Sequence, residues 1–191
     1  VVGGDSRLST PMLEAALVAG LASEGVEVHR LGLAPTPAVA FEAARLGAMG
    51  VVVSASHNPY HDNGIKLFAP GGTKLPDDVE SRIEAALAEL DGPAVADPGP
   101  IRDTPPGDGY VEHLLAALDG RLLSGVRVVV DAANGAASGL VADVFQRSGA
   151  DVVVVHATPD GTNINAGCGA TDPAALQALV TAERADVGIA L

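Results

Sequence analysis

The chain has 191 residues, of which 48% are apolar and 18% charged, so it is long enough to bury one large core or two small ones. Its net charge of −13 at pH 7 disfavours nucleic acid and anionic membrane surfaces as partners. With five aromatic residues (Phe 3, Tyr 2, Trp 0), the core must be built from Val, Ala, Leu and Ile. This composition is typical of layered α/β folds with buried strands.

The first half of the chain alternates strands and helices. The expected elements are a strand ending near residue 5, a helix at 11–24, a strand at 26–31, a helix at 36–46, an apolar strand at 49–54 and a helix at 77–90. This βαβαβ order predicts a parallel sheet with right-handed crossovers. Residues 92–107 hold five of the 13 prolines, so we expect no regular element there and place a domain boundary at residue 107.

The second half, residues 108–191, repeats this order of elements. We expect helices at 110–118, 140–148 and 173–183, and strands at 127–131, 151–156 and 187–191. In both halves the first strand ends in Asp and the first long helix is closed by Gly, which indicates an internal structural repeat. The chain starts within a strand and without Met, and it stops at an apolar strand, so we expect a fragment of a longer protein.

The segment 54–68 carries most of the candidate chemistry. It follows a buried strand, at the edge of the sheet where open α/β folds bind ligands. Asn58 is predicted to cap a helical turn that begins at Pro59 and directs N–H groups at Ser56, which would form an anion site. Lys66, after the Asn-Gly turn, is expected to face back toward Ser56 and His57. The plainer alternative is that Ser56 caps a turn and His57 makes an ordinary structural hydrogen bond.

This segment closely resembles the active-serine loop of the α-D-phosphohexomutases, whose signature is Ser/Thr-Ala-Ser-His-Asn-Pro followed by Asn-Gly-x-Lys. The resemblance implies two tandem α/β/α layered domains with mixed, mainly parallel sheets. It also implies that Ser56 carries a phosphoryl group, that this phosphate ligates Mg²⁺, and that the ligand is a small-molecule sugar phosphate. His57 and Lys66 would assist proton transfer and charge neutralisation, and Asn58 would bind substrate. A serine hydrolase is disfavoured, because the nucleophile-elbow motif Gly-x-Ser-x-Gly is absent around Ser56.

Two further segments are similar to turns of the same family. The turn containing Asp5 and Arg7 would support the phosphoserine, and Arg7 offers a planar donor fork suited to phosphate or substrate. An ion pair between Asp5 and Arg7 that fixes the turn is the equal alternative. Position 4 is Gly where many members carry Arg, so less positive charge is expected there. The segment 131–138 resembles a structural turn of the family's second domain.

The loop 163–171 is similar to the branch of the family that acts on glucosamine phosphates. The implied reaction interconverts glucosamine 6-phosphate and glucosamine 1-phosphate through a bisphosphate intermediate. Mutases of neutral hexose phosphates, or a catalytically incomplete sugar-phosphate-binding fragment, are the alternatives. Cys168 marks the branch and is not expected to be a nucleophile, because nothing basic sits beside it in the sequence.

Several expectations concern the setting of the protein. The family's acidic metal loop would follow Leu191, so residues 1–191 alone are expected to be inactive. The single cysteine fits a reducing, cytoplasmic location. The oligomeric state is left open, with a homodimer among the alternatives.

Overall fold

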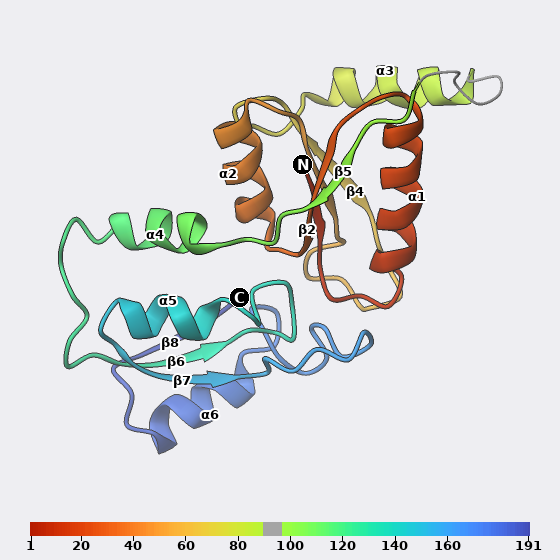
Figure 1. Ribbon diagram of the computed structural model, residues 1–191. Coiled ribbons are helices and arrows are strands. Elements are labelled where there is room, and N and C mark those ends of the chain that lie inside the picture. The colour runs from red at the N-terminus through yellow and green to blue at the C-terminus, as the bar shows by residue number, and fades with distance from the viewer. Residues whose placement is uncertain (90–96) are drawn as a thin grey trace.

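The computed structural model describes residues 1–89 and 97–191, which form two sheets flanked by helices (Figure 1). In this part of the chain the first sheet has the order β4-β3-β1-β2-β5. Its strands are β1 (Val2–Gly4), β2 (Val28–Leu33), β3 (Gly50–Val53), β4 (Ile65–Phe68) and β5 (Ile101–Asp103). All neighbours pair in parallel except β3 and β4, which are antiparallel. The sheet is therefore mixed and mainly parallel, as expected.

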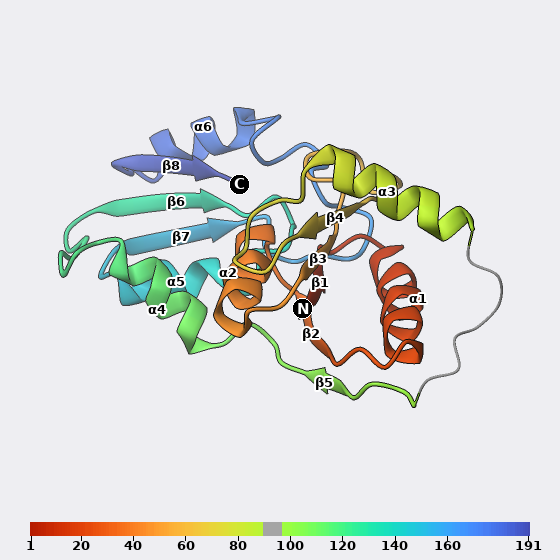
Figure 2. The ribbon, with the colours of Figure 1, turned by 90° about the horizontal axis from the view of Figure 1, so that it is seen from above.

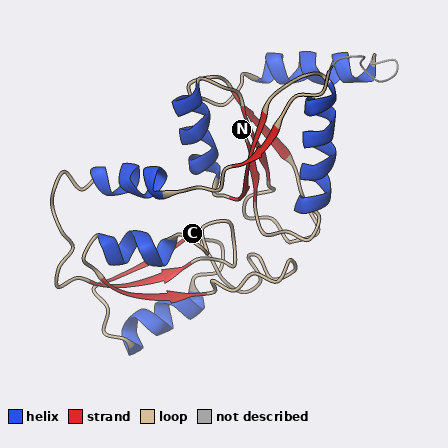
Figure 3. Cartoon of the chain, in the orientation of Figure 1, coloured by secondary structure: helices blue, strands red, loops and turns tan. Residues whose placement is uncertain are grey.

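Helices α1 (Thr10–Ser23) and α2 (Thr36–Leu46) cover opposite faces of this sheet (Figure 3). Val18 of α1 packs on one face against Val2 and Val28, and Val39 of α2 packs on the other against Val52. Helix α2 has the predicted bounds, because proline lies in its first turn and Gly47 ends it in a left-handed conformation at φ +60°. Helix α3 (Asp77–Ala88) has no buried residue.

Strand β5 corrects the prediction that residues 92–107 hold no regular element. Ile101–Asp103 pairs in parallel with β2, from Val28↔Ile101 to Arg30↔Asp103. The strand lies at the edge of the sheet and pairs with β2 on one side only. Prolines are tolerated at such an edge, because the missing N–H can face away from the neighbouring strand. Residues 92–96 of that prediction lie outside the described residues.

The second sheet confirms the predicted repeat. Within the described residues it contains β6 (Arg127–Asp131), β7 (Asp151–Val155) and β8 (Val187–Ala190), all parallel, in the order β7-β6-β8. The first sheet has the same arrangement, β2-β1-β3, with the first strand of each half in the centre. Helices α5 (Val141–Arg147) and α6 (Ala174–Ala182) lie on opposite faces (Figure 1).

Helix α4 (Asp108–Ala116) joins the two halves and packs against both α2 and α5 (Figure 2). Tyr110 is 4% exposed and belongs to the core beneath α2, where its ring lies 5.6 Å from that of Phe41. Burial raises the pKa of Tyr110. A helix that the sequence assigned to the second domain thus completes the core of the first. No helix in the described ranges is long and apolar enough to span a membrane.

Candidate functional site

The loops at the carboxyl ends of both sheets meet between the two halves of the chain (Figure 1). Hydrogen bonds across this contact include one from the Ser6 hydroxyl to the Asn134 carbonyl oxygen at 2.5 Å and one from Leu8 N–H to the Gly161 carbonyl oxygen at 2.8 Å. A pocket of about 360 Å³ lies at this junction. Ser56 and His57 line it from the first half, and residues of the turn after β6 and of the loop after β7 line it from the second.

Ser56 has an unusual backbone conformation at the edge of this pocket. Its φ is +55°, in the left-handed region that costs a non-glycine residue roughly 1–2 kcal/mol. Its N–H donates to the Ser54 hydroxyl oxygen at 3.0 Å, and that hydroxyl donates to Oδ2 of Asp5 at 2.6 Å. The Ser56 residue itself is exposed. The candidate nucleophile is therefore presented to the pocket on a strained but well-anchored turn.

The helical turn predicted at Pro59 is absent from the described structure. Residues 54–64, here called the serine loop, form two successive turns, in which Asn58 N–H donates to Ala55 and Asp62 N–H donates to Pro59. The Asn58 side chain bonds Oδ2 of Asp62 at 3.1 Å and caps no helix. No helix begins at Pro59 in the described structure, and the expectation that this segment binds an anion at Ser56 stays a prediction.

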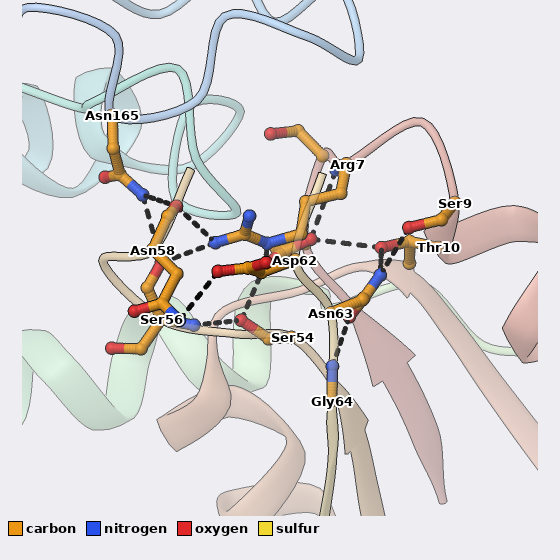
Figure 4. Close-up of polar contacts among 12 residues, drawn as sticks. Arg7, Ser9, Thr10, Ser54, Ser56, Asn58, Asp62, Asn63, Gly64 and Asn165 are labelled. Carbon is orange, nitrogen blue, oxygen red and sulfur yellow. Dashed lines mark hydrogen bonds and ion pairs between the residues drawn. The ribbon is translucent and has the colours of Figure 1, made fainter. Parts of the chain in front are cut away.

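Arg7 is 1% exposed and holds the serine loop from behind (Figure 4). Its Nε lies 2.9 Å from Oδ2 of Asp5, and its Nη2 donates to the carbonyl oxygens of Ser56 and Asn58, each at 2.9 Å. Nη1 donates to the carbonyl oxygen of Pro59. This geometry matches the alternative in which Arg7 fixes the turn, since most of its donors are engaged by the protein. It does not support the expectation that Arg7 binds phosphate or substrate.

His57 and Lys66 take different positions relative to the pocket. His57 is exposed and is the only lining side chain in the described residues that can carry a positive charge. Lys66 is exposed on the edge strand β4, in register with Val52, and makes no side-chain hydrogen bond or ion pair with described residues. The structure thus brings His57 to the pocket beside Ser56, while the role of Lys66 stays a prediction.

The residues present fit Mg²⁺ only in part. Asp5 is the only carboxylate among the described residues that line the pocket. Its oxygens already accept four hydrogen bonds, from Arg7 N–H, Arg7 Nε, Thr10 and Ser54. Because Mg²⁺ favours oxygen ligands and usually carboxylates, the ligands this segment could add are the oxygens of a phosphate on Ser56. The described residues do not complete a Mg²⁺ site by themselves.

A second cluster lies behind the pocket, and no local motif pointed to it. Asp131, His156 and Cys168 place one potential ligand atom each within 4.8 Å of one another. Asp131 is fully buried and accepts the N–H groups of Ala133 and Gly169, each at 2.9 Å. Nδ1 of His156 lies 3.0 Å from Oδ1 of Asp131 without the alignment of a hydrogen bond.

The described contacts give Asp131 a structural role in this cluster. Both of its carboxylate oxygens are occupied by backbone N–H groups. Burial, followed by the charges of Asp131 and Asp172, raises the pKa of the Cys168 thiol. The cluster ties β6 and β7 to the loop that contains Asn165.

Asn165 is the residue of the site that the sequence did not identify. Its side-chain Nδ2 donates to the carbonyl oxygens of Ser56 and Asn58, at 3.0 and 3.1 Å (Figure 4). The sequence singled out its loop as a mark of ancestry, because nothing local shows that residue 165 reaches a segment more than a hundred residues earlier.

Comparison with known proteins agrees with this architecture. Residues 1–93 match the family described as phosphoglucomutase/phosphomannomutase, alpha/beta/alpha domain I. A crystal structure of a phosphoglucomutase/phosphomannomutase family protein from Burkholderia thailandensis superposes on the whole chain with a TM-score of 0.81 and 31% identity, and the match covers 43% of that chain. The chain belongs to the phosphohexomutase superfamily, which confirms the resemblance inferred from residues 54–66.

The individual relatives are named more narrowly than the family. The phosphoglucosamine mutase of Frankia casuarinae is 57% identical over 194 residues, covering all of this chain and 42% of that protein. The chain thus spans about two fifths of the length of the curated relatives it matches. A structure of Aspergillus fumigatus N-acetylphosphoglucosamine mutase in complex with GlcNAc-6P and magnesium shares the fold, with a TM-score of 0.50 and 19% identity over 85% of this chain and 42% of that chain.

Proposed function

We propose that this chain forms the phosphoserine-bearing part of a phosphoglucosamine mutase, which interconverts glucosamine 6-phosphate and glucosamine 1-phosphate. The observation that carries the proposal is the presentation of Ser56 at the pocket, on a left-handed turn anchored by Ser54 and Arg7. The identity of 57% to a phosphoglucosamine mutase supports this substrate over other hexose phosphates.

In the proposed reaction, Ser56 carries a phosphoryl group in the resting enzyme. The bond between phosphorus and Oγ breaks as a bond forms between phosphorus and a substrate hydroxyl oxygen, and the proton of that hydroxyl leaves to a base while Oγ is protonated. The resulting bisphosphate turns over and returns its other phosphoryl group to Oγ. A serine monoester suits this task, because it is kinetically inert in water yet transferable when its oxygens are neutralised.

The neighbouring side chains have supporting roles in this proposal. His57 lines the same pocket and would bond the phosphate or the seryl oxygen. Lys66 would neutralise charge or move a proton, and Asn58 would contact substrate at the mouth of the loop. Bound Mg²⁺ would supply further neutralisation of the phosphate on Ser56. These local charges must overcome the net charge of −13, which repels an anionic substrate.

The phosphoserine is tested on the natural full-length gene product. Intact-mass analysis and peptide mapping should place one phosphate on Ser56. Ser56→Ala should remove both the phosphate and turnover, whereas Ser23→Ala, at an exposed hydroxyl near the end of α1, should change neither. A stable phosphate on Ser54 or Ser6 would contradict the assignment.

The substrate is tested by comparing kcat/KM for glucosamine 6-phosphate, glucose 6-phosphate and mannose 6-phosphate. We expect a preference for the amino sugar of roughly 5- to 150-fold. The ammonium group at C2 of the amino sugar can pair with a carboxylate of the binding site, whereas a neutral hydroxyl leaves that carboxylate underpaired, at a cost of about 1–3 kcal/mol. Equal or better use of a neutral hexose phosphate would favour the second candidate, a phosphoglucomutase or phosphomannomutase. The family match over residues 1–93 and the Burkholderia structure support that candidate, because both are described as phosphoglucomutase/phosphomannomutase.

A further inference from the structure

The serine loop receives hydrogen bonds from both halves of the chain at the same two atoms. The carbonyl oxygens of Ser56 and Asn58 each accept one bond from Nη2 of Arg7, in the first half. Each accepts a second bond from Nδ2 of Asn165, in the second half. Figure 4 shows Asn165 and Arg7 reaching the loop from separate segments of the chain. Two carbonyl groups are thus held between two side chains.

We propose that Asn165 is a positioning residue that holds Ser56 in its reactive conformation, so that the second half of the chain controls the geometry of the phosphoserine. This inference rests on the proposed function for its effect on turnover. Asn165 acts on the backbone of the serine loop and is not argued to touch the reacting atoms.

The chemistry of the asparagine amide fits this task. One nitrogen with two hydrogens serves two neighbouring carbonyl oxygens, so both N–H groups are used. Aspartate has the same shape but no donor, and its carboxylate would repel both oxygens. Alanine would remove the donors altogether. The side-chain amide at position 165 is therefore required for its donors and not only for its volume.

The backbone beneath Asn165 is rigidly placed. Asn165 has a φ of +58°, a left-handed conformation that asparagine tolerates better than most residues. Its own N–H donates to the Ala133 carbonyl oxygen at 3.0 Å, and the preceding Ile164 is buried. Gly169, further along the same loop, donates its N–H to the buried Asp131 carboxylate. The amide is thus presented from an anchored loop, which is what a positioning contact needs.

The contact matters because of the strain at Ser56. Its left-handed backbone at φ +55° is held only if the surrounding contacts determine it. Removing the donors of Asn165 leaves Arg7 as the remaining side chain on these carbonyls in the described structure, and the loop can then relax. Small displacements of a reacting group reduce rates by large factors, up to about 10²-fold for roughly 1 Å.

Ser6 provides a matched control for this idea. Its hydroxyl also bridges the two halves, through the Asn134 carbonyl oxygen, but among the described residues it makes no hydrogen bond to the serine loop. If Asn165 acted only by keeping the halves together, Ser6→Ala and Asn165→Ala would have similar effects. If Asn165 positions Ser56, only the Asn165 variants should affect the loop.

The experiment measures kcat, KM and hydrogen exchange in the serine loop for Asn165→Ala, Asn165→Asp and Ser6→Ala in the full-length gene product. For Asn165→Ala we expect kcat to fall about 10-fold or more, with KM changed less than about 3-fold. Amides of residues 54–62 should exchange faster. Asn165→Asp should be impaired at least as strongly despite its equal volume, and Ser6→Ala should resemble the unmodified protein.

Each outcome decides a separate question. If the unmodified protein has no mutase activity but the Asn165 variants still accelerate exchange in the serine loop, the proposed function fails and the positioning contact stands. If the protein is active, and Asn165→Ala and Asn165→Asp leave kcat within about 2-fold or leave exchange unchanged, the positioning proposal alone is overturned. Equal losses in Ser6→Ala would also overturn it.

Discussion

The Ser54 hydroxyl lies 2.6 Å from Oδ2 of Asp5, so the end of β3 is joined to the end of β1 by a single side-chain hydrogen bond. The same hydroxyl oxygen accepts the Ser56 N–H at 3.0 Å. One small side chain therefore connects the buried carboxylate to the backbone of the candidate nucleophile.

Replacing Ser54 should disturb both stability and turnover. Ser54→Ala deprives the 7% exposed Asp5 of a donor and the Ser56 N–H of its acceptor. We expect a loss of about 1–3 kcal/mol in the free energy of unfolding, measured by urea titration, together with a lower kcat. Ser23→Ala, on the surface, should stay within about 0.5 kcal/mol of the unmodified protein. Equal stability of the two variants would contradict this account.

Arg7 should behave as a structural residue. Arg7→Met leaves the carboxylate of Asp5 buried without its ion-pair partner and frees three loop carbonyls, so we expect a loss of about 3–5 kcal/mol in unfolding free energy. Arg7→Lys keeps the charge but not the planar fork of donors, so its free energy of unfolding should lie between those of Arg7→Met and the unmodified protein. Arg121→Met, at an exposed arginine, is the control. A raised KM with unchanged stability in Arg7→Met would restore the role in substrate binding.

Lys66 offers a test with a matched control, because the chain contains two lysines. If Lys66 neutralises charge on the phosphoryl group, Lys66→Met should lower turnover on the order of 10²-fold or more while the fold survives, since the side chain is exposed on β4. Lys74→Met removes an exposed lysine paired with Asp77 and Glu80 and should leave kcat unchanged. Near-normal kinetics in Lys66→Met would reduce Lys66 to a surface residue.

The Cys168 thiol should react slowly in the folded protein. Burial and the nearby Asp131 raise its pKa, so the thiol stays protonated to higher pH than a free cysteine. At pH 8, reaction with a disulfide reagent such as DTNB should be slow in the native protein and become fast in urea. Fast reaction of the native protein would mean that the neighbouring His156 activates the thiol, and Cys168→Ser gives the background.

The raised pKa of Cys168 also predicts that the stability of the folded protein depends on pH. Because the pKa is raised in the folded state, the folded protein holds this proton more tightly than the unfolded chain does. The contribution of Cys168 to stability is therefore complete below the unfolded pKa of about 8.5 and declines as the pH rises through the folded value. Comparing Cys168→Ser with the unmodified protein between pH 7 and 10 separates this contribution from that of other groups.

Most of the fold could be predicted from local patterns. Runs of valine predicted β3, β6 and β7, and the prolines near its start together with Gly47 predicted the ends of α2. Strand β5 was missed because it has three residues among prolines and owes its pairing to β2, far away in the sequence. Propensity does not report such a partner.

The site was predictable only in part. The motif identified Ser56 and placed His57 at the pocket, because both belong to one continuous segment. The contacts that hold this segment come from Arg7 and Asn165, which lie 49 and 109 residues from Ser56. The expectation that Arg7 binds phosphate followed from the chemistry of its side chain and from the resemblance of its turn to one in the family. A guanidinium group suits a set of carbonyl oxygens as well as it suits an anion.

The repeat also explains a correspondence between Asp5 and Asp131. Asp5 directly follows β1 and Asp131 ends β6, which are the central strands of the two sheets. Each accepts, through Oδ1, the N–H of the residue two positions later, at 3.1 and 2.9 Å. The same small turn thus occurs at equivalent points of the two sheets, which share the arrangement β2-β1-β3 and β7-β6-β8. Both copies of the turn therefore support the serine loop: Asp5 pairs with Arg7, which holds the loop from the first half, and Asp131 anchors the segment that carries Asn165, which holds it from the second half.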